Sequence, residues 1–503
     1  MVFKVRCAAV FAAFVFPGLA VAQDITLTSR DGALSISGIL TGYDGEFFRI
    51  SSAYGPLTID GQGVVCDGPA CPDLIAPKAL ITITGASDAG AKLLPPLLVA
   101  FAKAKGLTLT PGQPTVLADP VSGETLAEVS FTASSPKTAH DALLSGGATL
   151  AFASAVEPDL GAQSVALDAM VPIVARDNPM PAISTIDLAR VLSGEVTNWS
   201  EVGGPDMPLI LHGLAADSDV ARALRARLGK DPAVTVPHET LAELAAAVAK
   251  DPWAIAVTGR SVTGAAKLLP LTDSCGFPLL PSRLAVKAAD YPLTLPVFFL
   301  TPRHRLPLIA RELLDFLSTP EAQAAVAGAG YIDRSVERQP MTADGLRLIN
   351  AIKGAGKATS LEDLQRLVGV MDGADRLSLT FRFDDGTNTL DAGSQANLAD
   401  LAQMLEAGMF KGKALMLAGF SDGQGDAGAT MDLAQGRADA VLAALKAIVP
   451  GMPEALLPGV AAFGAALPIA CDAVPAGRRL NRRVEVWLKP TFAVDRPTNT
   501  LVP

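Results

Sequence analysis

Short β-prone runs dominate the first part of the chain. Leu34-Ser35-Ile36, Phe47–Ile50 and Leu57-Thr58-Ile59 are separated by glycine-containing turn signals such as Asp44-Gly45. Because each run is too short to form a core alone, we expect residues 24–75 to form one small β module. We assign this module to no family.

From residue 77 onwards, strand and helix patterns alternate. Leu80–Ile83 is an apolar strand, and a glycine turn follows it. One face of a helix is then marked by Leu94, Leu97, Leu98 and Phe101. The alternation continues to about residue 341, which predicts an α/β domain over 77–341.

The stretch 342–376 has a weaker pattern. Leu346, Ile349 and Ile352 suggest a helix, which ends in the glycine-containing run Lys353–Lys357. This run resembles a Walker loop only superficially, because the first glycine and the final hydroxyl residue are misplaced. We interpret 342–376 as a linker or a domain-packing segment.

The last regular part covers 377–490, before a tail of residues 491–503. Leu415–Ala418 predicts a buried strand, and a glycine-rich loop carrying Asp422 follows it. A helix with apolar positions at i, i+3, i+4 and i+7 then carries Arg437. A carboxylate and a guanidinium at one strand–loop–helix corner suit a zwitterionic ligand, with an ammonium and a carboxylate on the same carbon.

Composition and charge narrow the class of protein. The length of 503 residues predicts several domains, and the 50% hydrophobic content predicts ample core. The net charge of -10 argues against nucleic acid as a partner. Met1–Ala22 has the basic start, apolar run and Ala20-Val21-Ala22 cleavage pattern of a secretory signal peptide. We therefore expect a soluble mature protein in the periplasm.

The cysteines fit an oxidising compartment. Cys66 and Cys71 flank a turn, and we expect them to form a local disulfide. Zinc is the weaker interpretation, because no second close pair of ligands follows. Cys275 and Cys471 are assigned to separate domains, and the sequence leaves open whether they pair. We expect no cofactor and no metal.

Residues 377–490 resemble an OmpA-like peptidoglycan-binding domain. The resemblance rests on four ordered motifs: the strand Leu377–Phe383, Gly419-Phe420-Ser421-Asp422 with Gly425, Leu433 with Arg437-Ala438, and Asn481–Glu485. It implies that Asp422 and Arg437 hold the ammonium and carboxylate of diaminopimelate, with Gly425 and Thr430 in the same site. The chain departs from the family pattern at Ser421, Thr430 and Ala434. Asn481-Arg482-Arg483 is interpreted as a packing element.

Two other kinds of chemistry are weighed against this one. Gly419–Gly423 fits the Gly-x-Ser-x-Gly nucleophile elbow of hydrolases, which needs a histidine after Ser421 in chain order. All four histidines precede Ser421, so we favour a non-enzymatic protein. His212, among apolar neighbours, is interpreted as a strand-end residue rather than a metal ligand.

The region 77–341 resembles a type II periplasmic solute-binding protein of the phosphate-binding kind. The resemblance rests on Gly85-Ala86-Ser87, on Val165–Ala169 followed by Asn178-Pro179, and most on Leu192–Gly204. It implies two lobes with a cleft between them, the second lobe covering about 168–260.

In this family, phosphate binds to backbone and hydroxyl donors at helix N-termini. The matching positions are Ala86, Ser87, Ser134, Ser135, Ser154 and Ser218. The family's aspartate falls on Ala155, its arginine is missing near Gly213-Leu214, and Asp219 stands where a glycine is expected. We therefore expect an altered cleft that binds another ligand or none. The alternative is that these serines are ordinary helix caps.

Together these patterns predict a multidomain protein with a β module, a two-lobed α/β domain and a C-terminal α+β domain. The expected function is non-covalent attachment to peptidoglycan in a Gram-negative periplasm. The alternative is a receptor that delivers a phosphate-type or other small solute to an ABC importer, with wall attachment secondary.

Overall fold

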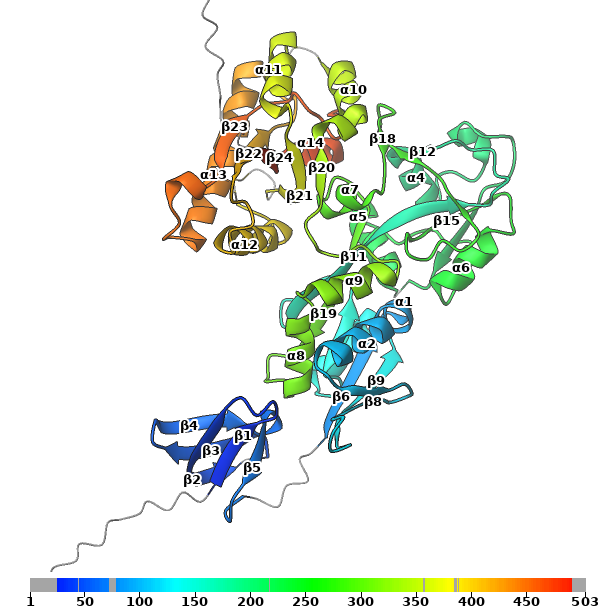
Figure 1. The fold of residues 1–503 in the computed structure, drawn as a ribbon. Coiled ribbons are helices and arrows are strands. Elements are labelled where there is room, and N and C mark those ends of the chain that lie inside the picture. Colours follow the sequence, from blue (N-terminus) through cyan, green and yellow to red (C-terminus); the bar gives the residue numbers. More distant parts are fainter. Residues whose placement is uncertain are drawn as a thin grey trace, which may run out of the picture.

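The computed structural model describes residues 25–43, 45–71, 78–216, 218–355, 358–383, 387 and 389–490. The predicted signal peptide, the tail 491–503 and Lys357 of the glycine-containing run lie outside the described residues. The chain is multidomain and combines a β module, an α/β middle domain and an α+β C-terminal domain, as predicted (Figure 1).

The β module is a single antiparallel sheet with the strand order β4-β3-β2-β1-β5. Its elements are β1 (Ile25–Ser29), β2 (Ser35–Tyr43), β3 (Phe47–Ser52), β4 (Gly55–Asp60), the 3-10 turn Gly61–Gly63 and β5 (Val64–Asp67). Ile25, Leu27, Phe48 and Ile50 form its core. A disulfide joins Cys66 on β5 to Cys71 in the turn that follows.

The first lobe of the middle domain is built around the strand order β19-β10-β6-β9-β8-β7. Its elements are β6 (Ala79–Gly85), α1 (Ser87–Lys92), α2 (Leu94–Ala104), β7 (Thr108–Thr110), β8 (Thr115–Ala118), β9 (Thr125–Ala133), α3 (Pro136–Leu144), β10 (Leu150–Ala153), β19 (Thr294–Thr301), α8 (Leu308–Phe316) and α9 (Pro320–Gly328). The predicted helix face Leu94, Leu97, Leu98 and Phe101 is buried in its core.

The second lobe continues the same sheet through β11, β15, β13 and β14. Its elements are β11 (Gly161–Val174), β12 (Ile183–Ser184), α4 (Thr185–Leu192), a 3-10 turn (Trp199–Val202), β13 (Ile210–Leu214), α5 (Asp219–Leu228), β14 (Val236–His238), α6 (Leu241–Val248), β15 (Ala254–Gly259), β16 (Lys267–Leu268), β17 (Leu271–Thr272), β18 (Pro278–Leu279) and α7 (Arg283–Lys287). Its core includes Leu279, Val286 and Tyr291, so the lobe extends beyond the expected end near Arg260.

The long strand β11 connects the two lobes. It pairs with β19 from Gly161 to Ala169, and with β15 from Met170 to Val174. The two lobes have separate hydrophobic cores on either side of this crossing. The cleft therefore lies between bodies that are joined by a few strands rather than by a shared core.

The C-terminal domain has the strand order β20-β21-β24-β22-β23. Its elements are β20 (Arg338–Pro340), a 3-10 turn (Met341–Asp344), α10 (Gly345–Gly354), α11 (Leu361–Met371), β21 (Asp375–Phe381), α12 (Ala392–Glu406), β22 (Lys413–Phe420), α13 (Ala427–Ile448), a 3-10 turn (Glu454–Leu456), β23 (Gly459–Ala462), α14 (Pro475–Asn481) and β24 (Arg483–Pro490). Helices α12 and α13 cover one face of the sheet, while α10 and α11 cover the other. The stretch 342–376 is thus a domain-packing segment. No helix within the described ranges has the length and apolar character needed to cross a membrane.

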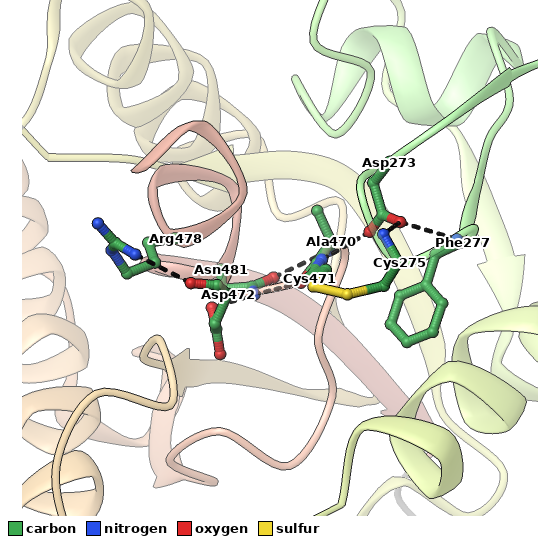
Figure 2. The surroundings of a disulfide bond; sticks show 8 residues. All are labelled: Asp273, Cys275, Phe277, Ala470, Cys471, Asp472, Arg478 and Asn481. Carbon is green, nitrogen blue, oxygen red and sulfur yellow. Dashed lines mark hydrogen bonds between the residues drawn. A yellow bond between two sulfur atoms is a disulfide. The ribbon is translucent and has the colours of Figure 1, made fainter. Parts of the chain in front are cut away.

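A disulfide links the second lobe to the C-terminal domain (Figure 2). Cys275, which precedes β18, is bonded to Cys471, which precedes α14, across 196 residues of sequence. Beside it, Asp273 accepts hydrogen bonds from the backbone nitrogens of Cys471 at 2.6 Å and of Phe277 at 2.8 Å. The pairing that the sequence left open is a crosslink between domains.

A buried ion pair lies at the same interface. Asp290, which follows α7 in the second lobe, contacts the guanidinium nitrogens of Arg376 at 2.7 Å and Arg382 at 3.0 Å. Asp290 is 5% exposed and Arg376 is fully buried. Burial alone would raise the pKa of Asp290, but Arg376 and Arg382 outweigh it and hold that pKa below its usual range.

The ion pair continues into the C-terminal sheet. A carboxylate oxygen of Glu485 lies 2.5 Å from Arg347, 2.7 Å from Arg483 and 3.3 Å from Arg376. Its other oxygen accepts a hydrogen bond from the Trp487 indole at 3.0 Å. Glu485 is fully buried, and although burial would raise its pKa, the surrounding arginines lower it well below its usual range.

We expect Asp290→Asn to destabilise the junction by about 3–5 kcal/mol, because two buried guanidiniums lose their shared charge partner. Hydrogen exchange of amides in α7 and β21 measures this loss locally. The matched control is Asp141→Asn, which removes the exposed partner of Lys137 and should leave this protection nearly unchanged. Equal effects of the two substitutions would contradict a special role for Asp290.

The same cluster predicts acid sensitivity. The pKa values of Asp290 and Glu485 are lowered in the folded chain. Their stabilisation is therefore complete above the unfolded values near about 4 and is lost as the pH falls below them. We expect protection of α7 and β21 amides to decrease between pH 5 and 3, at about those unfolded values. The prediction fails if that protection does not change over this interval.

Candidate functional site

The predicted strand–loop–helix corner is formed by β22, the loop after Phe420 and α13. A Cβ atom on Gly419 would lie 2.1 Å from the carbonyl oxygen of Ala434, so glycine is needed for α13 to pack this closely. The loop includes Gly425 at φ +119°, a conformation that favours glycine. Asp426 then caps α13, because its carboxylate accepts a hydrogen bond from the Ala429 nitrogen at 2.8 Å.

Asp422 and Arg437 are both 8% exposed at this corner. Asp422 pairs with Arg482 rather than with Arg437, at 3.0 Å between oxygen and nitrogen. The Nη1 of Arg437 donates a long hydrogen bond to the Phe420 carbonyl at 3.5 Å, and its buried Nε has no partner among the described residues. Burial lowers the pKa of Arg437, while Asp422 acts in the opposite direction. The corner therefore offers a carboxylate together with a guanidinium that has spare donor capacity.

Two other residues of the motif have internal roles. Thr430, predicted as part of the binding site, is fully buried, and its hydroxyl donates to the Ala427 carbonyl at 3.0 Å. Its hydroxyl is used within the first turn of α13 and is not exposed to a ligand. The hydroxyl of Ser421, 3% exposed, donates to the carbonyls of Thr430 at 3.0 Å and Asp422 at 3.1 Å. These contacts give it a structural role and do not support a nucleophile.

Sequence reasoning left Arg482 out of the site. Its neighbours Asn481 and Arg483 are buried, and Asn481 holds the backbone of Ile469 and Ala470, as a packing element should. Arg482 instead reaches the loop and pairs with Asp422. Asn481 ends α14, Arg482 lies between this helix and β24, and Arg483 begins the strand, so three adjacent polar residues belong to different elements and no periodicity in the sequence separates their roles.

The second candidate site is a cavity of about 400 Å³ between the lobes of the middle domain. All six positions predicted for the cleft line it: Ala86, Ser87, Ser134, Ser135, Ser154 and Ser218. Two of the serines are also helix caps, as the alternative interpretation holds. Ser135 accepts from the Thr138 nitrogen at the start of α3, and Ser218 accepts from the Ala221 nitrogen at the start of α5. Capping and lining are compatible here.

The charges in this cavity are negative. Its lining includes the four carboxyl residues Asp88, Asp168, Asp219 and Glu239, and no lysine, arginine or histidine among the described residues. Burial raises the pKa of Asp88, Asp168 and Asp219. A phosphate placed here would be repelled by the carboxylates and would lack a cationic partner.

Asp219 occupies the donors that an anion would use. One of its carboxylate oxygens accepts hydrogen bonds from the Ser154 hydroxyl at 2.7 Å and the Ser154 backbone nitrogen at 3.1 Å. Asp219 lies in the first turn of α5, where a negative charge is favoured by the helix dipole. The chain's own carboxylate therefore stands where the sequence-based interpretation places an external anion.

His212 lies in the middle of β13 rather than at a strand end as predicted, and it has a partner that the sequence did not reveal. Its Nδ1 lies 3.0 Å from Nε2 of His238, and the two rings are stacked. Burial and the nearby His238 lower the pKa of His212. The described residues contain no group of three or more potential metal ligands, so this pair stays an isolated contact.

Comparison with known proteins assigns both domains. Residues 382–482 match the OmpA family, and residues 79–320 match a PBP superfamily domain. The chain joins a PBP-like domain to an OmpA-type domain. Asp422, Arg437 and Arg482 all lie within the OmpA-type match, and the whole cleft lining except Tyr331 lies within the PBP-like match.

Solved structures resemble the PBP-like domain. A Clostridium perfringens protein assigned as a phosphate ABC transporter substrate-binding protein, solved with bound phosphate, is 16% identical. The alignment covers 50% of this chain and 99% of that one, with a TM-score of 0.43. An ABC-type phosphate transport receptor from Vibrio cholerae is 18% identical over the same shares, with a TM-score of 0.39. No curated protein matches this chain.

We expect the parent protein to bind inorganic phosphate more weakly than about 1 mM at neutral pH, because Asp219 occupies the Ser154 donors. Asp219→Asn should bind phosphate more tightly than the parent, since it removes one repelling charge from the cavity. Calorimetry with the full chain measures both. Asp187→Asn, in the first turn of α4 outside the cavity, is the matched control. Micromolar binding by the parent would contradict this view of the cleft.

Proposed function

We propose that this protein is a non-enzymatic component of a Gram-negative envelope that binds peptidoglycan non-covalently through its OmpA-type domain. Asp422 receives the ammonium of diaminopimelate, and Arg437 receives the carboxylate on the same carbon. The observation that carries this proposal is the buried Arg437 guanidinium, which lies near the Asp422 carboxylate and whose Nε has no hydrogen-bond partner among the described residues. A bidentate carboxylate would complete its hydrogen bonding.

The compartment follows from the same reasoning. Peptidoglycan lies in the periplasm of Gram-negative cells, and residues 1–22 carry the pattern of a secretory signal peptide. The two disulfides, Cys66–Cys71 and Cys275–Cys471, favour an oxidising compartment. Peptidoglycan binding and disulfide formation thus both require export of the chain.

A second candidate function concerns the cleft. The cavity of about 400 Å³ is large enough for a small solute, and it favours a receptor that delivers a solute to an ABC importer. Its four carboxyl residues oppose a phosphate or another oxyanion as that solute. We therefore place wall binding first, and treat solute delivery as the alternative that the phosphate measurement addresses.

We expect Asp422→Ala and Arg437→Ala each to weaken peptidoglycan binding by about tenfold to a hundredfold. Each leaves one ligand charge unpaired, at a cost of about 1.5–3 kcal/mol. Arg437→Lys should not restore full binding, because an ammonium cannot form the bidentate contact. The measurement is co-sedimentation of the full chain with purified diaminopimelate-type peptidoglycan.

The matched control is Asp432→Ala, which removes an exposed carboxylate from α13 five residues before Arg437. It should sediment like the parent. Folding of each variant is checked by circular dichroism. If both site variants still sediment fully while folded, the site is misassigned. If Ser421→Ala alone abolished function, a hydrolase would have to be reconsidered.

A further inference from the structure

The β module is attached only to the first lobe through the contacts between described residues. Asp60 pairs with Arg305 at 3.4 Å and with Arg311 on α8. The Gln62 side chain accepts a hydrogen bond from the Leu308 nitrogen at 2.8 Å, and the Arg305 guanidinium lies 4.0 Å from the Phe47 ring centroid. Figure 1 shows the module beside α8, so it should move with this lobe.

The OmpA-type domain is attached to the second lobe instead. The Cys275–Cys471 disulfide and the buried contacts of Asp290 hold it there. The connecting segment contacts both lobes. The buried Lys287 of α7 contacts Asp333 at 2.9 Å and Glu337 at 3.0 Å, while Tyr331 packs in the core of the first lobe and the Arg334 backbone nitrogen donates to Gln323 of α9. A covalent bond and several buried charges make this the stiffer of the two junctions.

The contacts across the cleft between described residues are mainly polar, and they include hydrogen bonds from the Leu241 backbone to the Asp88 carboxylate and between Tyr331 and Ser261. The Asp219 carboxylate bridges to Ser154, and Arg222 of the same helix pairs with Glu157 at 3.0 Å. Another bridge joins Lys92 to the Ser261 carbonyl at 3.1 Å. Because each lobe has its own core, separating the lobes breaks such polar contacts and leaves both cores intact.

We propose that Asp219 is a built-in latch that holds the cleft closed, and that its release repositions the β module relative to the OmpA-type domain. The flanking domains are mounted on opposite lobes, so any rotation of the lobes about β11 must change their separation. With the OmpA-type domain on peptidoglycan, the β module would be the part that moves. The anchoring rests on the proposed function, whereas the movement itself does not.

Two residues of one helix form the latch. Asp219 and Arg222 lie one turn apart at the start of α5, and each reaches across to the segment after β10. Removing both should raise the population of open molecules on the order of tenfold or more, since charge-assisted contacts are lost.

Distances between spin labels in the chain beginning at Gln23 test this proposal. The labels are placed on Thr58→Cys in the β module and Asp432→Cys on α13, both exposed positions. The four native cysteines of the described residues are disulfide-bonded and do not take a label. The parent should show one main distance, and Asp219→Ala with Arg222→Ala should shift or broaden it by several ångströms.

Two controls separate the latch from a general loss of structure. Asp187→Ala with Arg190→Ala removes an ion pair of the same i, i+3 spacing on α4, within the second lobe, and should leave the distance unchanged. A second label pair, Lys250→Cys with Asp432→Cys, spans only the second lobe and the OmpA-type domain. It should stay constant in the latch variant.

Each outcome is decisive. A constant distance between the β module and α13 in the folded latch variant overturns the proposal. An equal change in the second label pair overturns the rigid attachment on which it depends. If the double variant does not fold, Ser154→Ala removes a donor from the other side of the latch. Peptidoglycan sedimentation is measured separately, so loss of anchoring and loss of movement remain distinguishable.

Discussion

The arrangement of this protein depends on a cluster of buried charges where the second lobe meets the OmpA-type domain. Asp290 and Glu485 are nearly or fully buried, and each is stable as an anion only because arginines surround it. Arg376 contacts both carboxylates and so joins the two domains through one side chain. Burying charges is costly unless every member is paired, so neither domain can leave the other without exposing or unpairing this cluster. The disulfide beside it makes the same junction covalent.

This constraint gives the two candidate sites a fixed relation. The corner holding Asp422 and Arg437 belongs to the OmpA-type domain, and half of the cleft belongs to the lobe that this domain is fastened to. The other half, with Ser154, belongs to the lobe that carries the β module. The second lobe and the OmpA-type domain thus form one stiff unit, and the first lobe with the β module forms another, joined to it through β11 and mainly polar contacts. Polar contacts at the cleft and buried charges at the domain junction make the cleft the element of lower stability.

Local sequence patterns predicted much of the fold and of the candidate sites, and the features that they missed share one cause. The spacing from Asp422 to Arg437, the six cleft positions and the β module are all readable within short stretches. Arg482 against Asp422, His238 against His212 and Arg382 against Asp290 are contacts between separate elements, which no periodicity encodes. Helix α10 shows a subtler failure. Leu346 and Ile349 correctly predict a helix, yet they are exposed while Arg347 is buried, because its charge is needed by Glu485. The inner face of α10 therefore carries a charged residue that pairs with Glu485, instead of the apolar residues usually found there.

At the cleft, the preference of a helix N-terminus for negative charge can be met either by a bound anion or by a carboxylate of the chain itself. The N-terminus of a helix favours negative charge, and hydroxyl and backbone donors gathered there favour an anion. From the sequence, the resemblance places donors for phosphate at Ser154 and Ser218, and the carboxylate of Asp219 beside them predicts an altered cleft. In the structure, Asp219 satisfies the same preference from within the chain, at 2.7 Å from the Ser154 hydroxyl. The Ser154 donors are therefore present, but Asp219 already occupies the position of an external anion. A carboxylate on a tether has a high effective concentration, so a solute must offer more than charge to displace it. Asp219 therefore occupies the Ser154 donors from within the chain, while those donors stay in place at the cleft.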